Sequence, residues 1–307
     1  NSFWHNKSRY IKYFLCLIIL FITLIKKKEK TLVFAFQANI YAIIIAKILN
    51  VKIITRSNSA PSGWSKNYIK NSVYKFIIKL SNDVMVNSIE FKKSFEKKFK
   101  VKVACIYNPF NKNFIIDKLK SKKKLKFFKK NYLNIISVGR LTDQKDHLTL
   151  LKSIKLLEPE FKIKVIIIGK GINEKPLQNF ITENKLKEKI KLLGYTNNPF
   201  PYIRKANIVI LTSRFEGLPN ILLEAQYLRK YIISTDCPTG PREILLNGKA
   251  GDLIKIKDHK KLSLLIKEYH NKKKLIANKI NIGSKNFYRF NYELNCKKYL
   301  DFVNKNF

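Results

Sequence analysis

Short apolar runs alternate with longer amphipathic stretches along nearly the whole chain. The short runs predict buried strands, and stretches whose apolar residues recur every three or four positions predict helices. In the first part, predicted helices cover 9–25, 38–49, 65–80 and 88–99, and predicted strands cover 31–35, 51–55, 83–86 and 103–107. Apolar strands separated by helices indicate a parallel sheet covered on both faces.

Residues 110–130 interrupt this alternation and carry the Lys122–Lys124 run, so they are interpreted as a linker with a short helix. The alternation then restarts. Predicted strands cover 132–138, 163–168, 190–193, 207–211 and 230–234; predicted helices cover 145–157, 175–184 and 201–205 and begin near 219, 241 and 260. The pattern therefore predicts an α/β fold with two Rossmann-like, doubly wound parallel-sheet domains.

The apolar stretch 14–25 resembles a membrane span but is too short for one, and Lys12 and Lys26–Lys28 bracket it. We expect a buried helix there. An alternative is that the basic start of the chain (Lys7, Arg9, Lys12 and Lys26–Lys28, with Trp4, Phe14 and Leu15) touches a membrane surface. The sequence leaves both interpretations open.

The charge is extreme: 62 Lys and Arg against 21 Asp and Glu give a formal net charge of +41 in 307 residues. Such a field attracts nucleic acid, anionic membrane or phosphorylated substrates. The lysines are spread along the chain, which fits a general compositional bias better than a dedicated polyanion site. Four scattered cysteines and four histidines show no metal-type spacing, and the cysteines fit a reducing cytoplasm.

The most informative stretch is 211–225, Leu-Thr-Ser-Arg-Phe-Glu-Gly-Leu-Pro-Asn-Ile-Leu-Leu-Glu-Ala. A strand, a turn at Gly217 and a helix beginning near Pro219 leave backbone N–H groups that favour anions, phosphate above all. Glu216 and Glu224 fit such a site if they accept hydrogen bonds from hydroxyl groups beside the phosphates. Alternatively, Glu216 only favours the helix N-terminus and Glu224 is an ordinary helical residue.

Other strand ends carry related signals. Gly139 and Arg140 end a strand, and Lys145 is predicted to open the next helix, so a guanidinium and an ammonium should meet a phosphate at that edge. The turn Gly169-Lys170-Gly171 lacks the third glycine of a dinucleotide fingerprint. The loop 237–243, Cys-Pro-Thr-Gly-Pro-Arg-Glu, enters another helix, and the polar loop 56–63 follows an earlier strand.

Together, Gly-Arg-x4-Lys, Gly-Lys-Gly, Ser-Arg-Phe-Glu-Gly-Leu-Pro-Asn-x3-Glu-Ala and Pro-Thr-Gly-Pro-Arg-Glu resemble the retaining GT-B glycosyltransferases of family 4. The resemblance is strongest to members that build lipid-linked bacterial glycans. It covers the second half nearly throughout and the first half more loosely, through Thr-Arg-Ser-Asn-Ser-Ala-Pro and Ile-Tyr-Asn-Pro.

The resemblance implies roles by position. Arg140 and Lys145 would hold the diphosphate of a nucleotide sugar, with UDP as the expected nucleotide; Glu216 would contact the donor sugar and Glu224 the ribose. The other expected donor-site residues are Gly139, Gly217, Leu218, Pro219 and Asn220, with Arg56 and Asn58 on the acceptor side. No metal cofactor is expected. The implied acceptor is a polyprenyl-diphosphate-linked or other cell-envelope glycan, at the inner face of the cytoplasmic membrane.

The expected domains are an acceptor domain at 1–109, a linker at 110–130, a donor domain at 131–285 and a helix at 286–307 that crosses back to the first domain. Family members begin with a further βαβ unit, so the first domain is expected to be incomplete at its start. Three alternatives stay open: an inactive remnant that binds only nucleotide, a nucleotide-sugar epimerase, and a basic nucleic-acid-binding protein.

Overall fold

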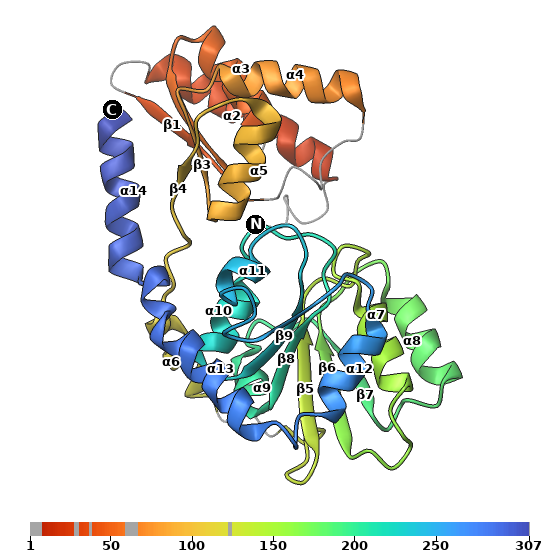
Figure 1. Cartoon of the computed structure of the whole chain (residues 1–307). Coiled ribbons are helices and arrows are strands. Elements are labelled where there is room, and N and C mark those ends of the chain that lie inside the picture. The colour runs from red at the N-terminus through yellow and green to blue at the C-terminus, as the bar shows by residue number, and fades with distance from the viewer. Residues whose placement is uncertain (1–7, 28–30, 37–38, 59–66, 122–124, 307) are drawn as a thin grey trace. The chain divides into compact units, whose positions relative to one another are not determined.

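A computed structural model describes residues 8–27, 31–36, 39–58, 67–121 and 125–306. They form two compact units (Figure 1). Unit 1 contains the residues up to Asn108 and those from Glu293 onward, and unit 2 runs from Pro109 to Tyr292. The predicted features at Trp4, Lys7, Lys28 and Lys122–Lys124 lie outside the described residues.

Unit 1 is built on a parallel four-stranded sheet in the order β1-β2-β3-β4. Its strands are β1 (Leu32–Ala35), β2 (Lys52–Ser57), β3 (Asp83–Val86) and β4 (Ala104–Cys105). Its helices are α2 (Arg9–Lys26), α3 (Asn39–Ile48), α4 (Tyr68–Lys79), α5 (Ile89–Phe99) and α14 (Tyr292–Asn306).

Helix α5 shows how the sequence produces these elements. The Ser88 hydroxyl accepts a hydrogen bond from the Phe91 amide at 3.2 Å, which caps the helix N-terminus. Phe91, Phe95 and Phe99 recur at four-residue spacing and are fully buried against β3. Lys100 then ends the helix in the left-handed conformation.

Helix α2 differs from the buried helix that was expected. Leu24 is buried, but the side chains of Ile11, Phe14, Ile18, Ile22 and Ile25 are exposed, with Phe14 64% exposed. The apolar run therefore covers more of the helix surface than unit 1 buries. None of the helices in the described ranges is both long enough and apolar enough to cross a membrane.

Unit 2 contains a parallel six-stranded sheet in the order β10-β9-β8-β5-β6-β7. The strands are β5 (Leu133–Val138), β6 (Ile163–Ile168), β7 (Ile190–Gly194), β8 (Ile208–Leu211), β9 (Tyr231–Thr235) and β10 (Asp252–Ile254). The helices are α6 (Lys112–Leu119), α7 (His147–Lys155), α8 (Glu174–Glu183), α9 (Phe200–Lys205), α10 (Asn220–Tyr227), α11 (Pro241–Ile244), α12 (His259–Lys267) and α13 (Lys273–Lys285), followed by the 3₁₀ helix Phe287–Phe290.

Helices cover both faces of this sheet, as continuous apolar strands require. Figure 1 shows α7, α8 and α12 on one face and α10 and α13 on the other. The fold prediction of two parallel-sheet α/β domains is therefore confirmed. The differences are local: β10 was missed, β4 is only two residues long, and Lys145 precedes its helix, because Asp146 adopts a left-handed conformation and α7 begins at His147.

The strand order fixes where unit 2 can bind a ligand. The chain runs from β5 outward to β7 on one side, then returns and runs from β8 outward to β10 on the other. Neighbours β5 and β8 therefore form the topological switch point of the sheet. In open parallel sheets the loops at the carboxyl ends of two such strands diverge and leave room for a ligand between them.

Candidate functional site

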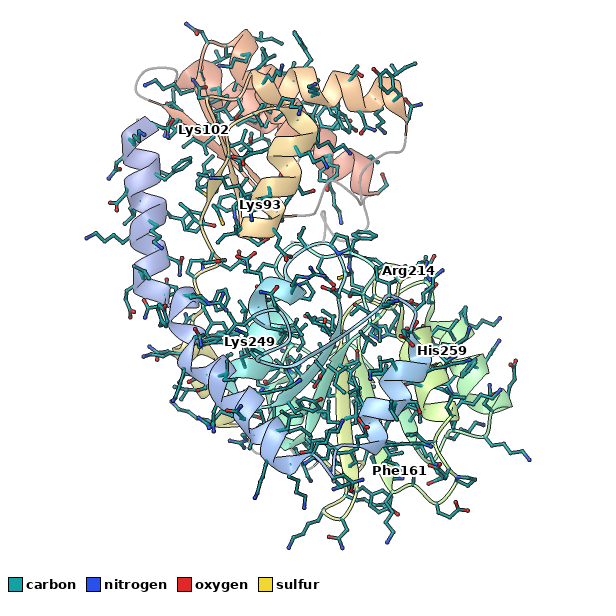
Figure 2. All side chains as sticks on the ribbon, viewed as in Figure 1. Lys93, Lys102, Phe161, Arg214, Lys249 and His259 are labelled. Carbon is teal, nitrogen blue, oxygen red and sulfur yellow. The ribbon has the colours of Figure 1, made fainter. Side chains whose placement is uncertain are left out.

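Arg140 and Glu216 lie in the loops that follow the two switch-point strands. Arg140 comes directly after Gly139 at the end of β5, and Glu216 lies between the end of β8 and the start of α10. In Figure 2, Arg214 of the same loop and Phe161, which precedes β6, lie at opposite ends of unit 2. The predicted donor-site residues thus belong to the carboxyl edge of the sheet.

Lys145 and Glu216 form an ion pair between these two loops. The Lys145 Nζ atom lies 2.6 Å from Glu216 Oε1, and the side chains are only 15% and 8% exposed. Away from water, each charge depends on the other for compensation. The sequence predicted both residues at the site, but it gave no sign that they would pair with each other.

Further hydrogen bonds tie the same loops together. The Gln144 side-chain amide donates to the Phe215 carbonyl at 3.0 Å, and the Arg214 amide donates to the Gln144 carbonyl at 2.8 Å. The Thr212 hydroxyl donates to the Lys145 carbonyl at 3.0 Å. Because backbone groups make most of these contacts, the loops hold the ion pair in a defined position.

Arg140 has a different environment. Its side chain is exposed, and Nη2 donates to the Gln144 side-chain oxygen at 3.3 Å. A guanidinium has five N–H donors in a planar fork. One contact leaves the others able to bind an anion, so Arg140 can supply positive charge that no acidic side chain of the described residues already neutralises.

Glu224 lies in α10, about one turn after its start. Neither a hydrogen bond nor an ion pair of its carboxylate is found among the residues that the structure describes. Burial raises the pKa of Glu224 to about 7. A carboxylate that has lost water without gaining a protein partner can accept hydrogen bonds from a ligand.

Glycines allow the turns at this edge to approach closely. A Cβ atom on Gly169 would lie 1.9 Å from the Gly139 carbonyl oxygen, and one on Gly171 would lie 2.3 Å from the Leu141 carbonyl oxygen. The Gly139 amide donates to Ile168 at 2.9 Å, and the Leu141 amide donates to Lys170 at 3.0 Å. The Gly-Lys-Gly turn thus supports the backbone on both sides of Arg140.

The loop 237–243 packs against the Glu216 turn, a contact that the sequence did not reveal. The Glu216 amide donates to the Pro238 carbonyl at 2.7 Å, and the Thr239 hydroxyl donates to the Gly217 carbonyl at 3.2 Å. Gly240 has φ +93°, and a Cβ atom there would lie 2.3 Å from the Gly217 oxygen. Burial, followed by the charge of Glu216, raises the pKa of the Cys237 thiol to about 12.

Three other predicted donor-site residues are placed mainly by packing. The side chains of Leu218 and Pro219 are buried, and Asn220 is the first residue of α10 and is exposed. Pro219 occupies the N-cap position, so the helix starts at Asn220, one residue after the start predicted near Pro219. Any contact of Leu218 or Pro219 with a ligand would therefore come largely from the backbone.

His147 is a buried neighbour of the site that the sequence analysis did not single out. Its Nδ1 lies 3.3 Å from the Ser137 hydroxyl on β5. Burial lowers the pKa of His147 to about 4, so the ring is neutral at pH 7. The sequence did place His147 at the start of a helix that follows a strand, where ligand-binding residues are common. A single histidine in an apolar pattern, however, is usually part of a core.

The predicted acceptor-side residues belong to unit 1. The Arg56 Nη2 atom donates to Asn108 Oδ1, and the Asn58 side-chain amide donates to the Phe36 carbonyl at 3.2 Å. Arg56 is partly buried and Asn58 is exposed, both at the carboxyl end of β2.

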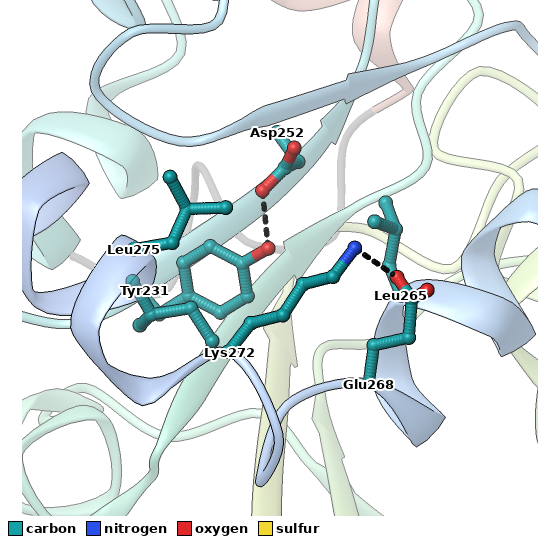
Figure 3. Close-up of a pocket in the computed structure, with 7 residues that line it drawn as sticks. Tyr231, Asp252, Leu265, Glu268, Lys272 and Leu275 are labelled. Atoms are coloured by element: carbon teal, nitrogen blue, oxygen red, sulfur yellow. Dashed lines mark hydrogen bonds and ion pairs between the residues drawn. The ribbon is translucent and has the colours of Figure 1, made fainter.

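Unit 2 also contains a small pocket whose charged side chains pair with one another (Figure 3). Tyr231 and Asp252 begin β9 and β10, so the pocket lies at the amino edge of the sheet, opposite the carboxyl edge. The Tyr231 hydroxyl donates to Asp252, whose other oxygen lies 2.7 Å from Lys279 Nζ; Lys272 pairs with Glu268 at 2.8 Å. These acids already have basic or hydroxyl partners, which leaves little for a ligand to satisfy.

The fold and the site define an α/β protein with a cationic switch point. Residues 117–286 match the family of glycosyl transferases group 1. This region is more than half of the chain, and the protein belongs to that family. Its two parallel sheets are those of the GT-B fold.

Two curated relatives illustrate the similarity. An uncharacterized glycosyltransferase of Methanocaldococcus jannaschii is 36% identical over 183 residues, which is 56% of this chain and 44% of that protein. The N-acetylgalactosamine-N,N'-diacetylbacillosaminyl-diphospho-undecaprenol 4-alpha-N-acetylgalactosaminyltransferase of Campylobacter jejuni is 31% identical over 169 residues, 54% of this chain and 46% of that protein. The chain thus matches less than half the length of these relatives.

Solved structures support the fold over a longer stretch. HepE of Anabaena in complex with UDP-glucose has a TM-score of 0.80 at 18% identity, covering 93% of this chain and 82% of that one. A glycosyltransferase from Rickettsia africae has a TM-score of 0.78 at 18% identity, covering 98% and 83%. At this level of identity the likeness shows the architecture alone.

Proposed function

We propose that unit 2 binds a UDP-sugar at the switch point between β5 and β8. The observation that carries the proposal is the set of groups on this edge: the exposed Arg140, the Lys145–Glu216 pair, and the Glu224 carboxylate, which has no partner among the described residues. Cationic groups suit a diphosphate, and carboxylates suit sugar and ribose hydroxyls. A nucleotide sugar is a ligand that carries both kinds of group.

In this proposal Arg140 and Lys145 hold the diphosphate. The Lys145 ammonium would then donate hydrogen bonds to both the phosphate and Glu216. Glu216 would use its other lone pairs to accept hydrogen bonds from the hydroxyls of the donor sugar. Glu224 would accept from the ribose hydroxyls. Backbone groups of Gly139, Gly217, Leu218, Pro219 and Asn220 would line the site, as the resemblance to family 4 implies.

The proposed reaction moves a hexose or N-acetylhexosamine with retention of configuration. The bond from the sugar C1 to the diphosphate oxygen breaks, the acceptor oxygen bonds to C1, and the acceptor hydroxyl proton is released. Positive charge from Arg140 and Lys145 would stabilise the departing UDP without a metal ion. The alpha-transferase named for the Campylobacter relative supports retention, because UDP-sugars of this kind are alpha-linked.

We also propose that the acceptor is a cell-envelope glycan carried on a polyprenyl diphosphate, reached at the inner face of the cytoplasmic membrane. The support is the named substrate of the Campylobacter relative and the exposed apolar side of α2. Ile11, Phe14, Ile18, Ile22 and Ile25 lie at helical spacing, with Lys12, Lys26 and Lys27 on the same segment. Apolar side chains beside basic ones suit an anionic lipid surface.

The donor site is tested by calorimetric titration with UDP and several UDP-sugars, with and without EDTA. Arg140→Gln and Glu224→Gln should each weaken UDP binding about ten-fold or more, the loss expected for one charge-assisted hydrogen bond. Arg204→Gln, an exposed arginine on α9, is the matched control. If UDP does not bind while a short single-stranded DNA does, the transferase proposal is wrong for this chain.

A further inference from the structure

A second group of residues gathers around Arg56 at the carboxyl ends of β1 and β2 in unit 1. The Arg56 guanidinium carbon lies 5.4 Å from the centre of the Phe36 ring and 5.7 Å from the centre of the Tyr299 ring. Phe36 follows β1, and Tyr299 lies on α14. Distant parts of the sequence therefore meet on one guanidinium.

Two rings near a guanidinium restrain the cation without using its hydrogen-bond donors. Aromatic rings attract a guanidinium through their faces, whereas its N–H donors point outward in its own plane. One of those donors is used by Asn108. The other donors are held in a fixed orientation, which suits a ligand with a planar or tetrahedral set of oxygens.

The charge of Arg56 has no acidic partner among the described residues, because no carboxylate there lies within ion-pair distance of it. Burial lowers the pKa of Arg56, and its buried Nε lacks a hydrogen-bond partner among the described residues. A partly buried cation of this kind is stabilised when an anion completes its contacts.

We propose that Arg56 binds a phosphate group of the acceptor substrate and that Tyr299 is a positioning residue that holds the guanidinium for it. The inference rests on the proposed function, in which unit 2 holds the donor and a second substrate is required. Arg56 lies at the carboxyl edge of a parallel sheet, the edge at which such sheets bind ligands. The phosphate can belong to a polyprenyl diphosphate or be a free phosphate, and the experiment separates the two.

The test uses the whole chain saturated with UDP, so that the donor site is already occupied. Farnesyl diphosphate, farnesol and inorganic pyrophosphate are titrated in turn. The variants are Arg56→Gln, Arg56→Lys, Tyr299→Leu and Tyr299→Phe. Lys93→Gln changes an exposed lysine on α5 of the same unit and removes one positive charge from a residue outside the cluster. The UDP affinity and the unfolding midpoint of each variant show that it is folded.

Farnesyl diphosphate should bind the wild-type protein more tightly than farnesol. Arg56→Gln should weaken this binding about ten-fold or more, and Arg56→Lys should restore only part of it because an ammonium lacks the fork. Tyr299→Leu should weaken it several-fold, whereas Tyr299→Phe, which keeps the ring, should stay within about two-fold of wild type. Pyrophosphate binding of equal strength would identify a free-phosphate site, and weaker pyrophosphate binding would identify the lipid-linked form.

Three results would overturn the inference while leaving the donor proposal intact: UDP binds but farnesyl diphosphate and pyrophosphate do not, farnesol binds as well as its diphosphate, or Arg56→Gln behaves like Lys93→Gln. If Tyr299→Leu and Tyr299→Phe are equally weak, Tyr299 does not act through its ring. Failure of UDP to bind is a separate outcome that contradicts the donor proposal. In that case the binding of farnesyl diphosphate to wild type and to Arg56→Gln is compared in the absence of UDP.

Discussion

Glu216 and Glu224 come from one short segment, yet their carboxylates have different surroundings. Glu216 is paired with Lys145 at 2.6 Å, whereas Glu224 is desolvated without a partner among the described residues. The sequence identified both residues, as acceptors for different hydroxyl groups of a ligand, but it did not show that one carboxylate has a protein partner. The difference arises from Lys145, which belongs to another strand-end loop, so no local pattern could have shown it.

The Lys145–Glu216 pair makes a prediction about stability. Lys145→Met should lower the free energy of unfolding by about 3 kcal/mol, because it leaves the Glu216 carboxylate buried and unpaired. The double variant Lys145→Met/Glu216→Gln should recover part of the loss. Urea unfolding measures both, with Lys152→Met, an exposed lysine on α7, as the control. Equal losses in the single and double variants would contradict the pairing.

Glu224 makes a prediction about pH. Its pKa is about 7 in the folded protein and 4.5 ordinarily, so folding favours the protonated form. The stability associated with that proton is complete below pH 4.5 and is lost as the pH rises through 7. Glu224→Gln should therefore match wild type near pH 4.5 and exceed it at pH 8 by up to about 3 kcal/mol. Urea unfolding across this range tests the sign; a pH-independent difference would contradict it.

At the scale of elements, the contact between the end of β5 and the Gly169 turn predicts a severe substitution. Gly169→Ala should lower the free energy of unfolding by at least about 3 kcal/mol, because its Cβ would overlap the Gly139 carbonyl oxygen at 1.9 Å. UDP binding should weaken as well, since Arg140 follows Gly139. Gly194→Ala is the control: its φ of +76° is unfavourable for alanine, but its Cβ would make only an ordinary contact with Lys170 Cε at 3.9 Å, so about 1 kcal/mol is expected.

Helix α2 predicts attachment to anionic lipid. Phe14→Ser combined with Ile18→Ser should reduce co-sedimentation with phosphatidylglycerol vesicles several-fold, because both exposed side chains lie on the uncovered apolar side. Ile172→Ser changes a side chain that is 81% exposed in unit 2 and should have no effect. Equal binding by the two variants would show that α2 is not the lipid-binding surface.

The elements that could be predicted from sequence are those with continuous apolar runs. β6 coincides with its predicted range, and all six of its residues are buried. β10 was missed because Asp252, Leu253 and Ile254 are too few to show a pattern, and they form a strand only by pairing with β9. The start of α7 was misplaced because the left-handed Asp146 is imposed by the turn, not by helix propensity.

At the scale of the whole molecule, the +41 charge acts on any polyanion. Weak binding to single-stranded DNA is therefore expected at low salt and should be lost by about 0.3 M NaCl, as counterion release requires. UDP binding should persist over the same range, because its contacts are formed in a partly buried site. Fluorescence anisotropy measures the first and calorimetry the second. DNA binding that outlasts UDP binding would contradict this account.

Fold and family could be predicted because the sequence of a parallel-sheet protein shows a repeating pattern of strands and helices, with motifs at the strand ends. Contacts that combine remote segments could not. The Arg56 cluster needs Phe36 and Tyr299, which lie near opposite ends of the chain and carry no motif. Similarly, the 237–243 loop showed only its helix-entry pattern, not its hydrogen bonds to the Glu216 turn.

The chain passes between the two units twice, after Asn108 and after Tyr292. Unit 2 is therefore one uninterrupted stretch of the sequence, whereas unit 1 is assembled from segments on both sides of it. A stop codon directly after Tyr292 would leave all the strands of the described residues encoded. The damage would nevertheless fall on unit 1, since Arg56 would lose the ring of Tyr299. A nonsense mutation that follows unit 2 in the sequence would thus disturb a cluster that precedes it.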